Sequence, residues 1–72
     1  MASYLLFVIL NAHWMPATVR IPEPGPERRW HRVVDTSRDA WDDFLPEGGE
    51  VLLDPPDRYL CGPRSTVVLL AR

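Results

Sequence analysis

Apolar residues concentrate at the two ends of this chain and alternate with polar residues in between. Residues 4–10 form an unbroken apolar run that ends abruptly at Asn11. The run is too short to cross a bilayer, which takes about 20 residues, and its β-branched and aromatic members favour a strand. Because the run is apolar on both faces, we expect a central strand that is covered on two sides. A chain that begins inside such a strand is typical of a piece of a larger protein, or of a domain that docks on one.

The rest of the chain shows the pattern of short strands separated by proline and glycine. Residues 17–21 alternate between apolar and polar side chains, which is the period of a half-buried strand. Clusters of proline and glycine interrupt the pattern and force turns. Besides these two stretches, strands are expected over residues 28–35, 50–53, 58–60 and 65–71.

Two local expectations concern the middle of the chain. Strand alternation puts Trp30, Arg32 and Val34 on one face of their strand, and His31 and Val33 on the other. In the irregular segment that follows, Ser37 is expected to cap a single helical turn over residues 38–41.

The five or six short strands, with no helical period between them, predict an all-β sandwich or open barrel. The two most apolar strands, residues 4–10 and 65–71, lie at opposite ends of the sequence. Pairing them antiparallel in one sheet is expected to bury both, with Phe7 and Val68 in the core, and to bring the chain termini together.

Composition narrows the class of protein. The 72 residues suffice for one domain, whose small core gives it marginal stability. The single cysteine, Cys61, has no partner for an internal disulfide, which indicates a reducing compartment and predicts a cytoplasmic location. The net charge of −2 gives no electrostatic reason to expect nucleic acid or an anionic membrane as a partner.

The residues that carry chemistry are scattered. A zinc site needs four ligands with some at close spacing, whereas His13, His31 and Cys61 stand far apart, so we expect neither a metal nor another cofactor. Cys61 lacks a neighbouring orienting group that would make it a nucleophile. The acidic residues between Asp39 and Glu50 are the type used in pairs by glycoside hydrolases, but their position in an irregular stretch favours a solvated loop.

Three tryptophans are many for a chain of this length. An exposed indole ring can stack on the apolar face of a sugar, and any of the three could do so. The structural alternative places Trp30 in the core, with Trp14 and Trp41 covering the ends of the sandwich or meeting another domain.

Three segments of the chain, taken in order, match the pattern of one known family. An apolar strand ending in Asn11-Ala12-His13-Trp14 precedes a strand that begins at Pro16. A strand led by Trp30 ends in Asp35-Thr36, and Arg64-Ser65 opens the last apolar strand. Together these segments, which cover residues 4–70, resemble the C-terminal β-domain of bacterial glycogen debranching enzymes of the isoamylase type, within the α-amylase superfamily of glycoside hydrolases.

This resemblance implies a small antiparallel Greek-key β-sandwich of about six to seven short strands, which forms a single C-terminal accessory domain over residues 1–72. In that family a separate (β/α)8 barrel hydrolyses α-1,6 branch points of glycogen, and no catalytic residue of the barrel has a counterpart here. The residues themselves add two expectations. Asp35 and Thr36 should bond to nearby backbone in a turn, and Arg64 should pair with a carboxylate such as Asp35 or Asp54.

The function that the resemblance implies is non-catalytic: the domain packs against the barrel of its own enzyme and stabilises it. The alternatives are a free-standing carbohydrate-binding module that holds an α-glucan on exposed tryptophans, and an unrelated small interaction domain. The isolated domain is expected to hide its docking surface in a symmetric homodimer. The residues predicted to form this docking or sugar-contact surface are Trp14, Met15, Trp41, Phe44 and Leu45. The competing interpretation is that the last three of them cap the open end of the sandwich.

Overall fold

The computed structural model describes residues 4–72, and in this range it consists of strands, turns and loops without a helix. Among these residues, therefore, no helix is available that could cross a membrane. The expected strands are all present, and the bounds of the last one were predicted without error. The strands are β1 (Leu5–Asn11), β2 (Ala17–Arg20), β3 (Trp30–Asp35), β4 (Val51–Leu52), β5 (Arg58–Cys61) and β6 (Ser65–Ala71).

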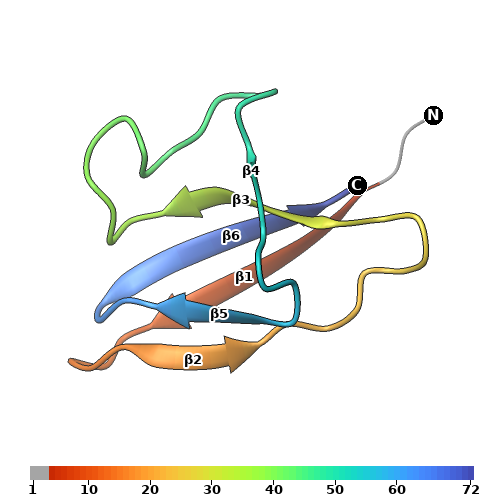
Figure 1. Cartoon of the computed structure of the whole chain (residues 1–72). Coiled ribbons are helices and arrows are strands. Elements are labelled where there is room, and N and C mark those ends of the chain that lie inside the picture. The colour runs from red at the N-terminus through yellow and green to blue at the C-terminus, as the bar shows by residue number, and fades with distance from the viewer. Residues whose placement is uncertain (1–3) are drawn as a thin grey trace.

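The strands form two antiparallel sheets that pack face to face (Figure 1). One sheet has four strands in the order β1-β6-β3-β4, and the other pairs β2 with β5. Along the chain, the connections pass repeatedly from one sheet to the other, as in Greek-key sandwiches. The predicted all-β antiparallel sandwich is confirmed.

The core lies between the two sheets. Leu69 and Val67 of β6 and Cys61 of β5 have no exposed surface. Trp30 is also buried, as one interpretation of the tryptophans predicted. Its ring meets Phe7 edge-on at a centroid distance of 6.0 Å, and its Nε1 donates a hydrogen bond of 2.6 Å to the carbonyl of Pro22. The remaining core residues are Ile9, Ile21, Leu53 and Ala71.

The first and last strands pair antiparallel in one sheet, as predicted, with Leu5 opposite Ala71. The expectation that both are buried is wrong for β1. It is an edge strand, and the side chains of Leu6, Val8 and Leu10 are exposed. The physical reason is that the two-stranded sheet covers only one face of the four-stranded sheet. β6 is one of the two inner strands, and its second face is only half-buried.

Two expectations about the middle of the chain are also wrong. The register of β3 against β6 shifts between Arg32 and Val34, so Val34 pairs with Val68 and lies on the face opposite to Trp30. Such a bulge inserts a residue and reverses the alternation beyond it. No helical turn forms over residues 38–41, because the side chain of Asp35 binds the Ser37 amide and organises a turn instead.

Candidate functional site

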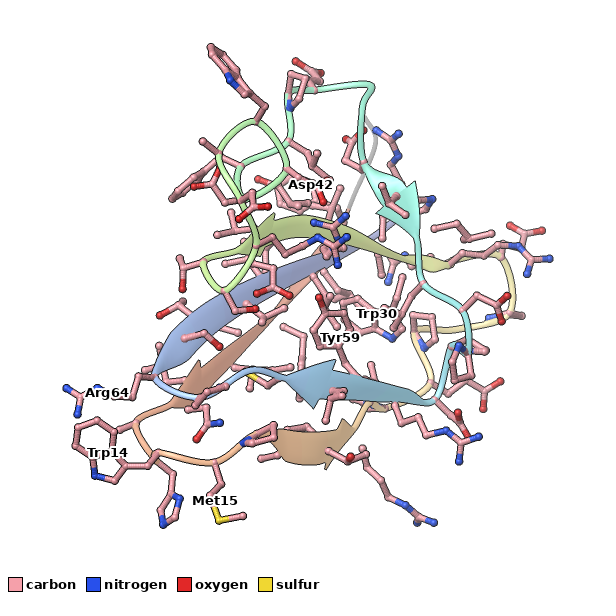
Figure 2. All side chains as sticks on the ribbon, turned by 60° about the vertical axis from the view of Figure 1, so that its left-hand side comes forward. Trp14, Met15, Trp30, Asp42, Tyr59 and Arg64 are labelled. Atoms are coloured by element: carbon pink, nitrogen blue, oxygen red, sulfur yellow. The ribbon has the colours of Figure 1, made fainter. Side chains whose placement is uncertain are left out.

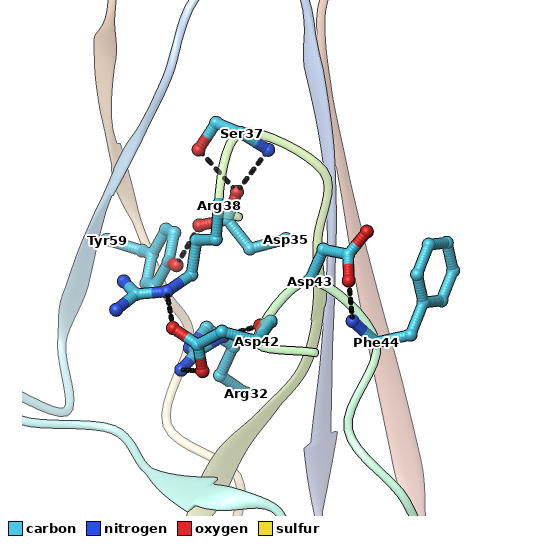
Figure 3. Close-up of polar contacts among 8 residues, drawn as sticks. All are labelled: Arg32, Asp35, Ser37, Arg38, Asp42, Asp43, Phe44 and Tyr59. Atoms are coloured by element: carbon cyan, nitrogen blue, oxygen red, sulfur yellow. Dashed lines mark hydrogen bonds and ion pairs between the residues drawn. The ribbon is translucent and has the colours of Figure 1, made fainter. Parts of the chain in front are cut away.

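A polar cluster at the end of β3 ties the two sheets together (Figure 3). Asp35 is buried and accepts hydrogen bonds from the Ser37 amide (3.0 Å) and hydroxyl (2.6 Å) through Oδ1. Its Oδ2 accepts a hydrogen bond from the Tyr59 hydroxyl, which comes from the opposite sheet. The Thr36 hydroxyl accepts a hydrogen bond from the Thr66 amide. The contacts of Asp35 with Ser37 confirm its predicted turn-forming role, whereas the Thr36 hydroxyl bonds to the neighbouring strand β6.

The charges in this cluster follow from its contacts. Burial by itself would raise the pKa of Asp35, but the hydrogen bonds from Ser37 and Tyr59 outweigh it, and the pKa lies below its ordinary value. Burial raises the pKa of Tyr59, and the hydrogen bond to Asp35 raises it further. Asp35 is therefore an ionised carboxylate fixed by hydrogen bonds, and not a proton donor. The role of the cluster is structural, because it links the two sheets.

A second group of charges fixes the loop between β3 and β4. Arg32 is buried, and its guanidinium donates to the Asp42 carbonyl (2.8 Å) and to Oδ1 of the same residue (3.2 Å). Arg38 donates to Asp42 Oδ2 at 2.5 Å. The hydrogen bonds from Arg38 and Arg32 lower the pKa of Asp42. Asp42 is thus an anchor of the loop, and it lacks the raised pKa of a general acid.

The five residues predicted as a docking or sugar-contact surface do not come together on one surface. Trp14 and Met15 lie exposed in the turn between β1 and β2 (Figure 2). Trp41 is 94% exposed in the loop after β3, so it does not cap the sandwich. Phe44 is exposed beside Val34, with which it forms an isolated bridge, and Leu45 is half-buried.

The turn that joins β5 to β6 holds the Trp14 ring. The Arg64 guanidinium lies over this ring at 4.5 Å from its centroid (Figure 2). This position corrects the expectation that Arg64 pairs with Asp35 or Asp54. The physical reason is local: the Arg64 backbone, at φ 50°, donates to the His13 carbonyl at 3.0 Å, which places its side chain beside Trp14.

An apolar surface that was not predicted from the sequence covers the four-stranded sheet on the side that faces away from β2 and β5. Directly paired residues share a face of a sheet, so the register defines its rows. The first row is Leu6, Leu70, His31 and Leu52, and the second is Val8, Val68, Val34 and Phe44. Leu10 and Thr66 form a shorter third row. We call these ten residues the outer face. The sequence signals only that both faces of these strands are apolar, since neither β1 nor β6 contains a charged residue.

The remaining chemical groups are dispersed or inaccessible. Cys61 is fully buried and lies 3.2 Å from the Ser65 hydroxyl. The His13 imidazole accepts a hydrogen bond from the Met15 amide. Across residues 4–72, no three histidine, cysteine, aspartate or glutamate side chains gather closely enough to hold a metal ion. An open groove of about 560 Å³ runs between residues 23–30 and 52–56, and it is lined by prolines and by charges of both signs.

Comparison with known proteins gives two findings. Residues 2–56 match the family model described as "Isoamylase 1-3, C-terminal". A similar protein is "Isoamylase 3, chloroplastic" of Oryza sativa subsp. japonica, which is 34% identical over 67 residues. The matched region is 93% of this chain but only 8% of that relative, so the chain corresponds to a small part of the relative's length. No solved structure matches the chain.

Proposed function

Because this chain belongs to the isoamylase 1-3 C-terminal family, we propose that it packs against the catalytic barrel of a glycogen debranching enzyme and stabilises that barrel. The chain by itself is a non-catalytic accessory domain, since the family that it matches is a C-terminal domain and the catalytic barrel is not part of it. In the complete enzyme, the barrel hydrolyses α-1,6 branch points of the glucan. The observation that carries the proposal is the family match over residues 2–56 of a chain whose polar clusters serve structural roles.

Source and location are part of the same proposal. We place the parent enzyme in a bacterium and the chain in its cytoplasm. The bacterial source rests only on the resemblance of the three sequence segments. The relative named above does not support it, since that relative is a plant protein. Cys61 supports a reducing compartment, since it is a free thiol packed in the core.

A second candidate function is α-glucan binding by exposed tryptophans. The exposure of Trp14 and Trp41 favours it. Against it, the two residues belong to different loops, and the Arg64 guanidinium occupies one face of the Trp14 ring. A titration of the chain with maltodextrin, followed by tryptophan fluorescence, tests this function, with Trp14→Ala and Trp41→Ala as the variants that should abolish any response.

Exchange of the domain tests the packing function. The 72-residue chain replaces the matched 67 residues of the rice isoamylase 3 named above, and the product is called the exchanged enzyme. The comparison enzyme is the rice protein truncated before those residues. We expect the exchanged enzyme to lose α-1,6 hydrolysis more slowly on heating than the truncated one. Equal rates of loss contradict the proposal. The isolated chain, incubated with branched glucan, should release no reducing ends above a buffer control.

A further inference from the structure

The outer face of the four-stranded sheet is unlike a surface that evolved to face water. In a sheet with one solvated face, residues along each strand normally alternate, so that apolar residues face the core and polar residues face water. Here both complete rows of the outer face are apolar except for His31, and the third row adds Leu10, which is 75% exposed. Contiguous apolar patches of this kind mark interaction surfaces.

The edge of the same sheet points to the same conclusion. β1 has a strand neighbour on one side only among residues 4–72, which leaves its other edge open. Exposed edge strands are usually protected by charges, prolines or bulges. The seven residues of β1 include neither a charge nor a proline, and their pairing with β6 is regular. Both the outer face and the open edge of β1 therefore lack the features that keep a sheet soluble and separate.

We infer that the outer face is the surface that docks on the catalytic domain of the parent enzyme, in place of the Trp14 and Trp41 loops. This inference rests on the proposed function and specifies its surface. The partner surface is aliphatic and uncharged, so that it matches the apolar outer face. An apolar sheet face is buried by helices or by another sheet, and a layer of helices can provide such a surface. The outer ring of a (β/α)8 barrel consists of helices.

The comparison with the rice protein favours this occupant over a second copy of the chain. The matched region is 8% of the rice protein, so in that relative the rest of the polypeptide is a large neighbour of the matched domain.

Two matched leucines test the inference. Leu6 lies on the outer face and is 57% exposed, and Leu60 lies on the outward side of β5 and is 64% exposed. In the exchanged enzyme, Leu6→Lys should shorten the half-life of activity on heating about tenfold or more, because a lysine would be buried without a partner. Leu60→Lys should leave the half-life within about twofold. In the isolated chain, both variants should melt close to the parent chain.

If Leu6→Lys unfolds the isolated chain, Leu6→Ala takes its place, because it removes apolar surface without adding a charge. It should shorten the half-life of the exchanged enzyme and leave the melting of the isolated chain unchanged. Equal effects of the Leu6 and Leu60 variants in the exchanged enzyme overturn the inference, while an exchanged enzyme that outlasts the truncated one still upholds the proposed function.

Two further outcomes are decisive. If the isolated chain sediments as a dimer that Leu6→Lys dissociates, and the exchanged enzyme does not respond to that variant, the occupant is a second copy and the inference is wrong. If the exchanged enzyme is no more durable than the truncated one, the proposed function itself fails, and the inference fails with it.

Discussion

The two sheets of this sandwich turn different kinds of side chain outward. The outward side of the two-stranded sheet carries Thr18, Arg20 and Arg58, with Leu60 as its apolar member. The outer face of the four-stranded sheet carries aliphatic and aromatic residues in consecutive rows. Both sheets contribute to one core, so burial within the domain explains their inward sides equally well. The difference between their outward sides shows that the four-stranded sheet has a second apolar face that residues 4–72 leave uncovered.

The largest expected effect separates the two sides of the inner strand β6. Leu69 points inward and is fully buried, while its neighbour Val68 points to the outer face and is half-buried. Leu69→Ala should cost about 2–5 kcal/mol of unfolding free energy. Val68→Ala should cost about 1 kcal/mol or less, because the Val68 side chain buries less apolar area than Leu69 when the isolated chain folds. Urea denaturation of both variants measures this, and equal losses would mean that the two sides of β6 are buried alike.

Val68 also shows how far a sequence pattern reaches. Alternation and turn residues predicted every strand, because these depend on neighbours along the chain. The pairing of the first strand with the last was predicted from the apolar character that the two share. The apolar runs 4–10 and 65–71 did not reveal which of their faces has a cover. That depends on the number of strands in the opposite sheet, which is a property of the whole fold. The same apolar sequence is compatible with a strand that is buried on both faces and with a strand that has one face exposed.

The candidate site was predictable in part for a similar reason. Asp35 accepts a hydrogen bond from the Ser37 amide two residues away, and this role followed from residue type and position. The Thr36 hydroxyl accepts from the amide of Thr66 in β6, a partner that was not predicted. The tie between Asp35 and Tyr59 spans 24 positions of sequence and was not predicted. Phe44 was foreseen as a surface residue, but its place on the outer face depends on the bulge that turns Val34 outward. A single inserted residue in a ladder leaves no clear mark in the sequence.

The next largest effect concerns the link between the two sheets. Tyr59→Phe removes the hydroxyl that donates to the buried Asp35 and should cost about 1.5–3 kcal/mol, the range for hydrogen bonds to charged groups. Tyr4→Phe is the control, because Tyr4 is exposed and outside the core. Thermal melting compares the two. A Tyr59→Phe variant as stable as the control would show that the sheets are joined by apolar packing alone.

Acid should weaken the same link. The pKa of Asp35 is lower in the folded chain than its ordinary value of 3.8. Asp35 therefore contributes stability that is fully present above that value and is lost as the pH falls through the lower, folded pKa. The urea concentration at the midpoint of unfolding, measured from pH 7 to pH 2, should decrease in the parent chain once the pH is below about 4. Asp35→Asn should flatten this fall, and Asp39→Asn should not. Parallel curves for the parent chain and Asp35→Asn would exclude Asp35 as the source of the acid sensitivity.

The smallest expected effect lies in the turn that leads from the two-stranded sheet into β6. Arg64 has a φ of 50°, a left-handed conformation that costs a side-chain-bearing residue about 1–2 kcal/mol. Its guanidinium recovers about 0.5–1 kcal/mol by lying over Trp14. Arg64→Ala loses the ring contact and keeps the backbone cost, whereas Arg64→Gly loses the contact and relieves the backbone.

We therefore expect Arg64→Gly to be more stable than Arg64→Ala by about 1 kcal/mol. At Arg20, which lies in the regular strand β2, the order should reverse, because glycine weakens a strand interior. Melting temperatures of the four variants provide the measurement. The reversed order between the two sites is the decisive result, since it depends on backbone conformation and cancels the loss of a positive charge that all four variants share. If alanine is better than glycine at both sites, the turn does not hold Arg64 in the left-handed region, and the position of its side chain over Trp14 needs another cause.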